Sequence, residues 1–244
     1  MMPGYPEALH KAVVQRYAGC GRYARGFVHH KLRLDPVFYA LLRHGYLPER
    51  GRLFDLGCGY GILPALIAAA GESYVRGDWP PGWPPPPRHL DLHGVDMSHR
   101  RLRVARAALG SAAHFEQADL RTIRIQSCSV IVMLDVMLYL EPEEQERLLK
   151  AAATALDPGG LLLMREADAA AGAAFRFTQW AERVVALFRG SSPWRLYYRS
   201  VADWTDLLQS AGFSVQRETM SQGTPFANLF YIARRNEKHV QPAV

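Results

Sequence analysis

Residues 52–63 decide how this chain folds, and they read Arg52-Leu53-Phe54-Asp55-Leu56-Gly57-Cys58-Gly59-Tyr60-Gly61-Ile62-Leu63. An apolar run leads to an acidic residue, three glycines follow at alternate positions, and a helix-like apolar run continues to Ala70. Glycine lets the backbone approach a bound ligand closely, and a helix start offers unpaired N–H groups to an anion. The stretch therefore predicts a strand, a tight ligand-binding turn and a helix N-terminus.

The spacing of these glycines is G-x-G-x-G, which differs from the G-x-G-x-x-G of dinucleotide dehydrogenases. A bare glycine turn also occurs as a purely structural element in other α/β proteins. The rest of the chain must therefore decide between a cofactor site and a structural turn.

The length is sufficient for one large α/β domain, or for one domain with a cap. The chain has 244 residues, of which 49% are hydrophobic and 21% charged, and these are ordinary values for such a domain. No apolar run approaches the roughly 20 residues of a membrane span. The first ten residues lack the apolar core of a signal peptide, and the three cysteines form no metal or disulfide pattern. We expect a cytoplasmic protein with no bound metal.

The formal net charge is +6, and arginine supplies most of the positive charge. An arginine-rich codon usage explains this as readily as an acidic partner does. Nucleic acid, a carrier protein and an anionic substrate all remain open as partners, because net charge alone does not choose among them.

Apolar runs and helical patterns alternate along the chain. They predict strands at 53–56, 90–96, 113–117, 129–134 and 161–164, with helices at 62–70, 99–109 and 142–156 between them. A stop at 157–160 precedes the fifth strand, and a helix at 201–211 and strands at 213–220 and 226–234 close the chain. This order predicts a parallel, doubly wound sheet with right-handed crossovers.

Four segments interrupt or flank this alternation. We interpret residues 1–50 as a basic helical arm and residues 71–89 as a proline-rich loop that Trp79 and Trp83 pack onto the body. Residues 168–199, with a helix at 169–190, are interpreted as a lid, and residues 236–244 as a tail. An ordinary helix packed on the sheet is the alternative interpretation of the lid.

Acidic residues fall at or near the ends of four predicted segments, at Asp55, Asp96, Asp119 and Asp135. The carboxyl ends of parallel strands meet at one edge of a sheet, where α/β proteins bind their ligands. We therefore expect these acids to converge with the glycine turn on one site.

With these motifs in this order, the chain from about residue 50 to 235 resembles the class I S-adenosylmethionine-dependent methyltransferases. The resemblance implies a methyltransferase domain at 51–235, with a seven-stranded, Rossmann-like sheet whose last strand is antiparallel. Residues 157–160, Asp-Pro-Gly-Gly, match the family's turn before the fifth strand.

The resemblance also implies a set of cofactor-binding residues. Asp96 would hold the ribose hydroxyls, and Met97 would pack on the adenine. Asp119 would accept from the adenine amino group, and Leu120 would supply a backbone N–H. The full set is Asp55, Gly57, Gly59 and Gly61 around the methionine part, then Asp96, Met97, Asp119 and Leu120, and Asp135 beside the transferred methyl group.

A narrower resemblance is to methyltransferases of bacterial aryl-polyene pigment pathways. The proline-rich loop, residues 177–180 and residues 220–228 carry it. It implies O- or C-methylation of an aromatic, hydroxybenzoate-derived acceptor, free or bound to a carrier protein. The chain has Leu138 where some relatives carry histidine, so this motif assigns no general base.

A phenolic oxygen or a ring carbon needs a base during methyl transfer, whereas the transfer itself needs positioning and exclusion of water. The candidate catalytic residues are His30, Tyr139 and Asp135, with His29 and Tyr23 as further possibilities. Histidine suits proton removal at neutral pH, and Tyr139 is equally plausible as an aromatic wall.

Two other function classes remain open. An RNA or protein methyltransferase would use the basic arm, and it predicts steeply salt-dependent RNA binding. A non-methylating or aminopropyl-transferring relative would share the fold. The Asn/Asp-Pro-Pro-Tyr/Phe tetrapeptide of amino-group methyltransferases is missing, because residues 135–138 read Asp-Val-Met-Leu.

Overall fold

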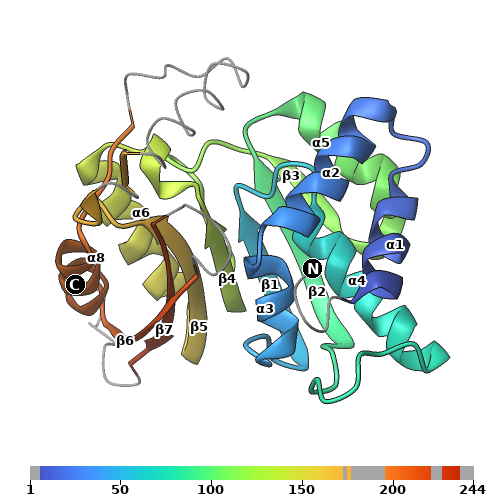
Figure 1. The fold of residues 1–244 in the computed structure, drawn as a ribbon. Helices are drawn as coiled ribbons and strands as arrows, with labels where there is room; N and C mark the ends of the chain where they lie inside the picture. Colours follow the sequence, from blue (N-terminus) through green and yellow to red (C-terminus); the bar gives the residue numbers. More distant parts are fainter. Residues whose placement is uncertain (1–5, 173–174, 177–195, 221–226, 237–244) are drawn as a thin grey trace. The chain divides into compact units, whose positions relative to one another are not determined.

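The computed structural model describes residues 6–172, 175–176, 196–220 and 227–236 (Figure 1). Its seven strands have the sheet order β3-β2-β1-β4-β5-β7-β6. Strand β7 (Asn228–Arg235) runs antiparallel to both of its neighbours. The predicted α/β fold with an antiparallel last strand is therefore confirmed. The chain divides into two compact units, residues 1–119 and 120–244, and each is described by itself.

The first unit opens with three helices, α1 (Glu7–Arg16), α2 (Arg22–Leu34) and α3 (Val37–Arg43). The backbone N–H of Val37 donates to Oδ1 of Asp35 at 3.1 Å, which fixes the start of α3. These helices lie where the sequence predicts a helical arm.

The sheet of the first unit consists of β1 (Arg50–Leu56), β2 (His89–Asp96) and β3 (His114–Gln117), all parallel. Helix α4 (Ile62–Arg76) follows β1, helix α5 (His99–Leu109) follows β2, and the short helix η1 (Gly110–Ala112) leads into β3. Ser98 caps α5 by accepting from the backbone N–H of Arg101. Parallel pairing brings the carboxyl ends of β1 and β2 together.

The proline-rich segment forms a loop between α4 and β2. The indole Nε1 of Trp79 donates to the carbonyl of Pro84 at 3.0 Å. The rings of Trp79 and Trp83 meet edge to face at 5.7 Å, and Trp83 lies 6.4 Å from the ring of Tyr39 on α3. The two tryptophans thus tie the loop to the first unit, as predicted.

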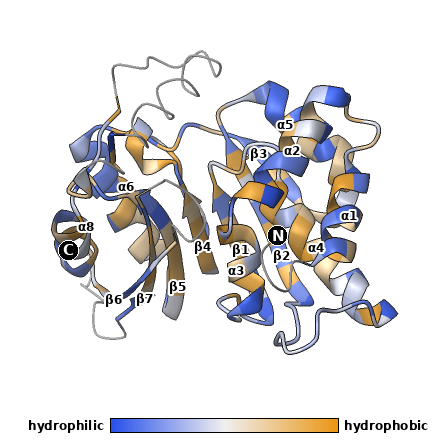
Figure 2. Cartoon of the chain, viewed as in Figure 1, coloured by the Kyte–Doolittle hydropathy of each residue, from blue (hydrophilic) through white to orange (hydrophobic). Residues whose placement is uncertain are grey.

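The second unit contains the other four strands, β4 (Cys128–Leu134), β5 (Leu156–Ala167), β6 (Phe213–Thr219) and β7. Its helices are η2 (Met137–Tyr139), α6 (Pro142–Ala155) and α8 (Val201–Ser210). Apolar residues dominate β4, and also α4 in the first unit (Figure 2). Ser200 and Asp203 cap α8 reciprocally, since each side chain accepts from the other's backbone N–H.

The predicted position of the Asp-Pro-Gly-Gly turn, before the fifth strand, is wrong. Strand β5 begins at Leu156, which pairs with Cys128, whereas Val130 pairs with Leu161. Residues 157–160 therefore bulge within the bounds of β5. The carboxylate of Asp157 holds the bulge, because it accepts from the hydroxyls of Ser127 at 2.8 Å and Ser129 at 3.1 Å.

Several predicted segments fall outside the described residues. They are most of the helix at 169–190, the connection at 221–226, the 177–180 segment and the tail from 237. Among the residues that are described, no helix has the length and hydrophobicity needed to cross a membrane.

Candidate cofactor site

The glycine turn closes onto the end of strand β2. The backbone N–H groups of Gly57 and Cys58 both donate to the carbonyl of Val95, at 2.8 and 3.0 Å. All three glycines have positive φ, at 84° for Gly57, 58° for Gly59 and 71° for Gly61. Residues other than glycine rarely adopt such angles. The turn that residues 52–63 predict is therefore built on a backbone that these glycines permit.

Gly59 and Gly61 differ in what surrounds them. A Cβ added at Gly61 would lie 3.0 Å from Cζ of Phe115 and 3.1 Å from Cβ of Ala105. A Cβ added at Gly59 would have no heavy atom within 4 Å. Gly61 is thus required by packing inside the unit, whereas Gly59 leaves open space beside its backbone that a ligand can occupy.

The carboxylate of Asp96 organises this turn from the end of β2. Its Oδ2 accepts from the backbone N–H of Gly59 at 2.9 Å, and its Oδ1 accepts from the N–H of Ser98 at 2.7 Å. A guanidinium nitrogen of Arg101 lies 3.7 Å away. A carboxylate offers about four acceptor positions, so each oxygen keeps capacity for a ribose hydroxyl. Asp96 therefore fits the role that the resemblance implies.

Asp55 lies buried beneath the turn, with a relative exposure of 4%. Burial, together with the smaller effect of the nearby charge of Asp96, raises the pKa of its carboxyl to about 7. Because the charge of Asp96 acts on the carboxyl of Asp55, a cation bound beside these two acids would relieve their repulsion. The methionine part of S-adenosylmethionine carries both a sulfonium and an ammonium group.

Two N-terminal helices contact the turn, and sequence reasoning missed the residue that connects α1 to it. The hydroxyl of Tyr17, just after α1, reaches the carbonyls of Tyr60 at 2.9 Å and Gly61 at 3.1 Å. The ring of Phe27 on α2 lies 5.2 Å from the ring of Tyr60. Tyr17 is fully buried, and the available signal was an aromatic residue within the basic segment 1–50.

The predicted adenine-binding residues are more exposed than Asp55 and Asp96. Met97 is 62% exposed, and its backbone carbonyl accepts from the side chain of Gln117 at 3.2 Å. Asp119 is half-buried at the end of the first unit, and Leu120 begins the second. The adenine roles of these residues stay predictions.

The histidines of α2 divide into an anchored one and an exposed one. Nδ1 of His29 contacts Nε2 of His10 at 2.9 Å, and Nδ1 of His10 contacts the hydroxyl of Tyr39 at 3.1 Å. Burial, with smaller effects of the nearby His29 and Arg33, lowers the pKa of His10 to about 4, so the His10 ring is neutral at pH 7. His30 is exposed, and Tyr23 is 68% exposed. Of the two adjacent histidines, His30 is the one accessible to an acceptor.

The second unit contains the other two catalytic candidates. Asp135 follows β4 with φ at 55°, and its Oδ1 accepts from Nε of Arg165 on β5 at 2.8 Å. A second bond joins Nη2 of Arg165 to Oδ2 of Asp135. Tyr139 is half-buried in η2. Asp135 is thus held by a buried cation that sequence reasoning missed.

Glu166 is a further residue that sequence reasoning missed. Its Oε1 accepts from the backbone N–H groups of Val136 at 3.2 Å and Met137 at 2.9 Å. Arg165 and Glu166 are both buried. Two charged residues directly after the apolar run 161–164 were the available signal, since buried charges in strands are costly unless paired.

Comparison with known proteins settles the family. Residues 26–218 match a family model described as "Methyltransferase domain". The chain belongs to this family. The cofactor of the chain is S-adenosylmethionine, and the open space at Gly59 together with the spare acceptor capacity of Asp96 fits a nucleoside cofactor.

Curated relatives are similar over part of the chain. A carboxy-S-adenosyl-L-methionine synthase from Aeromonas hydrophila subsp. hydrophila is 30% identical over 126 residues, which are 50% of this chain and 45% of the relative. A synthase of the same name from Aeromonas salmonicida is 29% identical over 126 residues, again 50% of this chain and 45% of the relative. The matched part thus spans about half the length of these relatives.

Solved structures agree with the fold. Magnesium protoporphyrin IX methyltransferase from Synechocystis PCC 6803 with bound SAH has a TM-score of 0.57 and 22% identity, covering 92% of this chain and 93% of that one. An O-methyltransferase family protein from Burkholderia thailandensis has a TM-score of 0.63 and 16% identity, covering 89% and 59%. At such identities the likeness concerns the fold alone.

Proposed function

We propose that this protein transfers a methyl group from S-adenosylmethionine to an aromatic, hydroxylated small molecule. The observation that carries the proposal is the turn at Gly59, where open space adjoins a backbone held by the Asp96 carboxylate. The acceptor is a hydroxybenzoate-like acid, free or on a carrier protein, as in aryl-polyene pigment biosynthesis. Nucleic acid is not the expected partner.

When bound, S-adenosylmethionine supplies an electrophilic methyl group on a good leaving group. Asp96 would orient the cofactor through its ribose hydroxyls. Asp55, Gly57 and Gly61 would shape the surroundings of the methionine part, and the raised pKa of the Asp55 carboxyl would fall when a cation binds nearby. Such positioning provides most of the rate enhancement that this reaction needs.

His30 is the preferred base for a phenolic proton, because it is exposed while His29 is engaged with His10. Asp135 is engaged with Arg165, which favours a role in positioning. Tyr139 remains a proposed base or aromatic wall. Replacing His30 by Gln would lower the turnover number if His30 takes the proton.

A second candidate function is formation of carboxy-S-adenosyl-L-methionine. The name that both curated relatives carry, carboxy-S-adenosyl-L-methionine synthase, favours it, and this reaction would use the cofactor without transferring its methyl group. RNA methylation by the basic arm is less favoured, and steeply salt-dependent RNA binding would be its signature.

Product analysis by mass spectrometry separates these functions. The protein is incubated with S-adenosylmethionine and either 4-hydroxybenzoate, carrier-bound hydroxybenzoate or a panel of small organic acids. We expect an acceptor heavier by one methyl group, together with S-adenosylhomocysteine. A cofactor heavier by one CO₂, taken from an organic acid of the panel that becomes lighter by one CO₂, with no methylated acceptor, would instead establish the second function.

A further inference from the structure

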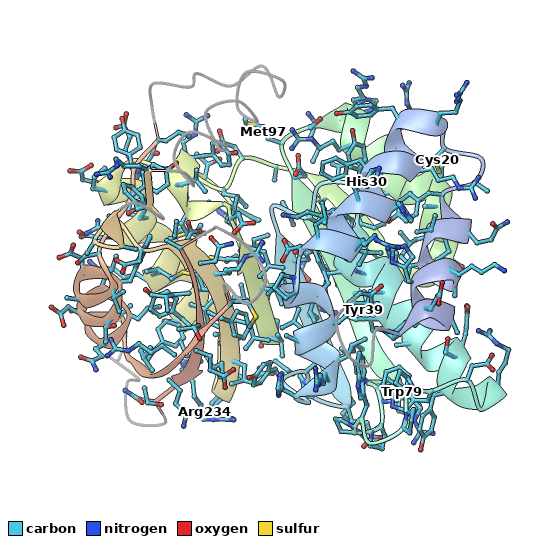
Figure 3. All side chains as sticks on the ribbon, in the orientation of Figure 1. Cys20, His30, Tyr39, Trp79, Met97 and Arg234 are labelled. Atoms are coloured by element: carbon cyan, nitrogen blue, oxygen red, sulfur yellow. The ribbon has the colours of Figure 1, made fainter. Side chains whose placement is uncertain are left out.

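A cavity lies in the first unit, at the opposite ends of β1 and β2 from the glycine turn. Its volume is about 300 Å³, and its lining comes from the end of α3 and from the proline-rich loop. The lining residues are Arg43, His44, Pro80, Pro81, Gly82 and Trp83. Seven residues of β1 separate the two ends, which is roughly 20 Å for a strand. In Figure 3, Trp79 and Met97 mark these ends.

The walls of this cavity are held in place before any ligand arrives. The indole of Trp83 meets Trp79 edge to face at 5.7 Å, and Trp79 is itself hydrogen-bonded to Pro84. Gly45 has φ at 66°, and a Cβ there would lie 3.2 Å from Cγ of Pro84. Proline also limits the conformations of the loop. A preformed cavity loses little entropy on binding.

The charge around the cavity is positive and uncompensated. Acidic residues near the loop are engaged elsewhere, since Asp78 pairs with Arg76 at 3.2 Å and Glu49 pairs with Arg88 at 3.8 Å. Arg43 forms no ion pair with any residue that the structure describes. The lining contains no acidic side chain. An anionic group is therefore the complementary ligand for this end of the cavity.

The remaining lining is flat and apolar. Trp83 offers an indole, and Pro80 and Pro81 offer their rings. Flat apolar surfaces of this kind pack well against an aromatic ring. A guanidinium binds a carboxylate through two parallel hydrogen bonds. His44 stacks on Tyr46 with ring centroids 5.4 Å apart, which holds a second nitrogen-bearing ring at the rim.

We propose that this cavity is a binding site for a small aromatic carboxylic acid. The carboxylate lies on Arg43, and the ring lies between Trp83 and the two prolines. The site is separate from the cofactor turn, and the proposal does not rest on the proposed methyl transfer.

Nuclear magnetic resonance of the full chain without cofactor tests this site, with benzoate as the probe. Benzoate lacks the phenol of the proposed acceptor, so binding reports the cavity and not turnover. We expect saturable shifts of the Trp83 indole signal, assigned with Trp83→Phe. Benzamide, which lacks the charge, and cyclohexanecarboxylate, which lacks the aromatic ring, should each bind more weakly.

Substitutions at Arg43 test directly whether its guanidinium binds the carboxylate of benzoate. Arg43→Gln should weaken benzoate binding roughly tenfold, because it removes one charge-assisted contact, and Arg43→Lys should retain part of the affinity. Arg100→Gln, an equal charge change on exposed α5, is the matched control and should bind normally. Absence of saturable shifts, equal binding of benzamide, or unchanged affinity in Arg43→Gln would overturn the proposal.

Discussion

Asp96 ends strand β2 and Asp135 directly follows strand β4, yet the two acids have different partners in the structure. Asp96 accepts from two backbone N–H groups and so shapes the glycine turn. Asp135 accepts from the side chain of Arg165, which is 1% exposed. An acidic residue at the end of a predicted strand can therefore have either of two roles. Asp96 holds the backbone of the glycine turn, whereas Asp135 is paired with a buried cation.

The backbone of the two acids differs as well. Asp135 is the one residue other than glycine with positive φ among the residues that the structure describes. Such a conformation costs free energy, so the surrounding contacts must hold it. The pairing with Arg165 provides such a contact. We infer that it fixes the backbone conformation of Asp135 directly after β4.

The largest expected effect is on cofactor affinity in Asp96→Ala. This change removes the acceptor for two backbone N–H groups and, in the proposed site, for the ribose hydroxyls. We expect a loss of about 3 kcal/mol, or roughly 100-fold in the dissociation constant, while the protein stays folded. Isothermal calorimetry with S-adenosylhomocysteine measures it. Asp91→Ala, at the other end of the same strand, should leave the affinity unchanged, and undiminished affinity in Asp96→Ala would contradict the assigned site.

The ion pair of Asp135 with Arg165 should make the larger contribution to the stability of the fold. Arg165→Met leaves the carboxylate of Asp135 without its buried cation, and this should lower the free energy of unfolding by about 3 kcal/mol. Urea denaturation measures the change. The control is Arg52→Met, whose pair with Asp91 is 37% and 41% exposed and should contribute less than about 1 kcal/mol. Equal effects of the two substitutions would remove the distinction between the buried and the exposed pair.

Alanine substitutions at Gly61 and Gly59 separate an effect on packing from an effect on cofactor binding. Gly61→Ala should cost about 2 kcal/mol of stability, from the left-handed backbone and the contacts with Phe115 and Ala105. Gly59→Ala should cost about 1 kcal/mol, from the backbone alone, yet weaken cofactor binding. Denaturation and calorimetry on both variants check this. Normal cofactor affinity in Gly59→Ala would show that the open space is not used.

Asp55 predicts a pH dependence of stability. Its pKa is raised from 3.8 to about 7 in the folded chain, so between pH 4 and pH 7 the unfolded chain binds fewer protons than the folded one. The contribution of Asp55 to stability therefore falls as pH rises through this window, by at most about 1.4 kcal/mol per pH unit. Asp55→Asn should remove that fall in urea denaturation at several pH values. A parallel pH dependence in the variant would contradict the buried-acid account.

Much of the fold was predictable because local signals and periodicity agree. The helix His99–Leu109 has the predicted bounds, and Ser98 caps it as expected. The strand that ends at Asp96 was predicted to within one residue of its start. In each case a capping residue or an apolar run marks the boundary without reference to distant parts of the chain.

Features that depend on distant partners were not predictable. Strand β5 begins at Leu156 because that residue pairs with Cys128, and a Gly-rich stop seen alone predicts a turn instead. The pairing of Arg165 with Asp135 joins residues 30 positions apart. Likewise, Tyr17 lies 43 positions from the carbonyl of Tyr60 that it contacts. These partners are determined by how the strands and helices pack in the folded chain.

The most direct test of the central claim is an amide map of cofactor binding. Uniformly labelled protein is titrated with S-adenosylhomocysteine, and backbone shifts are followed by nuclear magnetic resonance. The account predicts the largest shifts at Gly59, Asp96 and Ser98, and none at the indole of Trp83. Shifts that centre on the proline-rich loop and leave the glycine turn unchanged would contradict it.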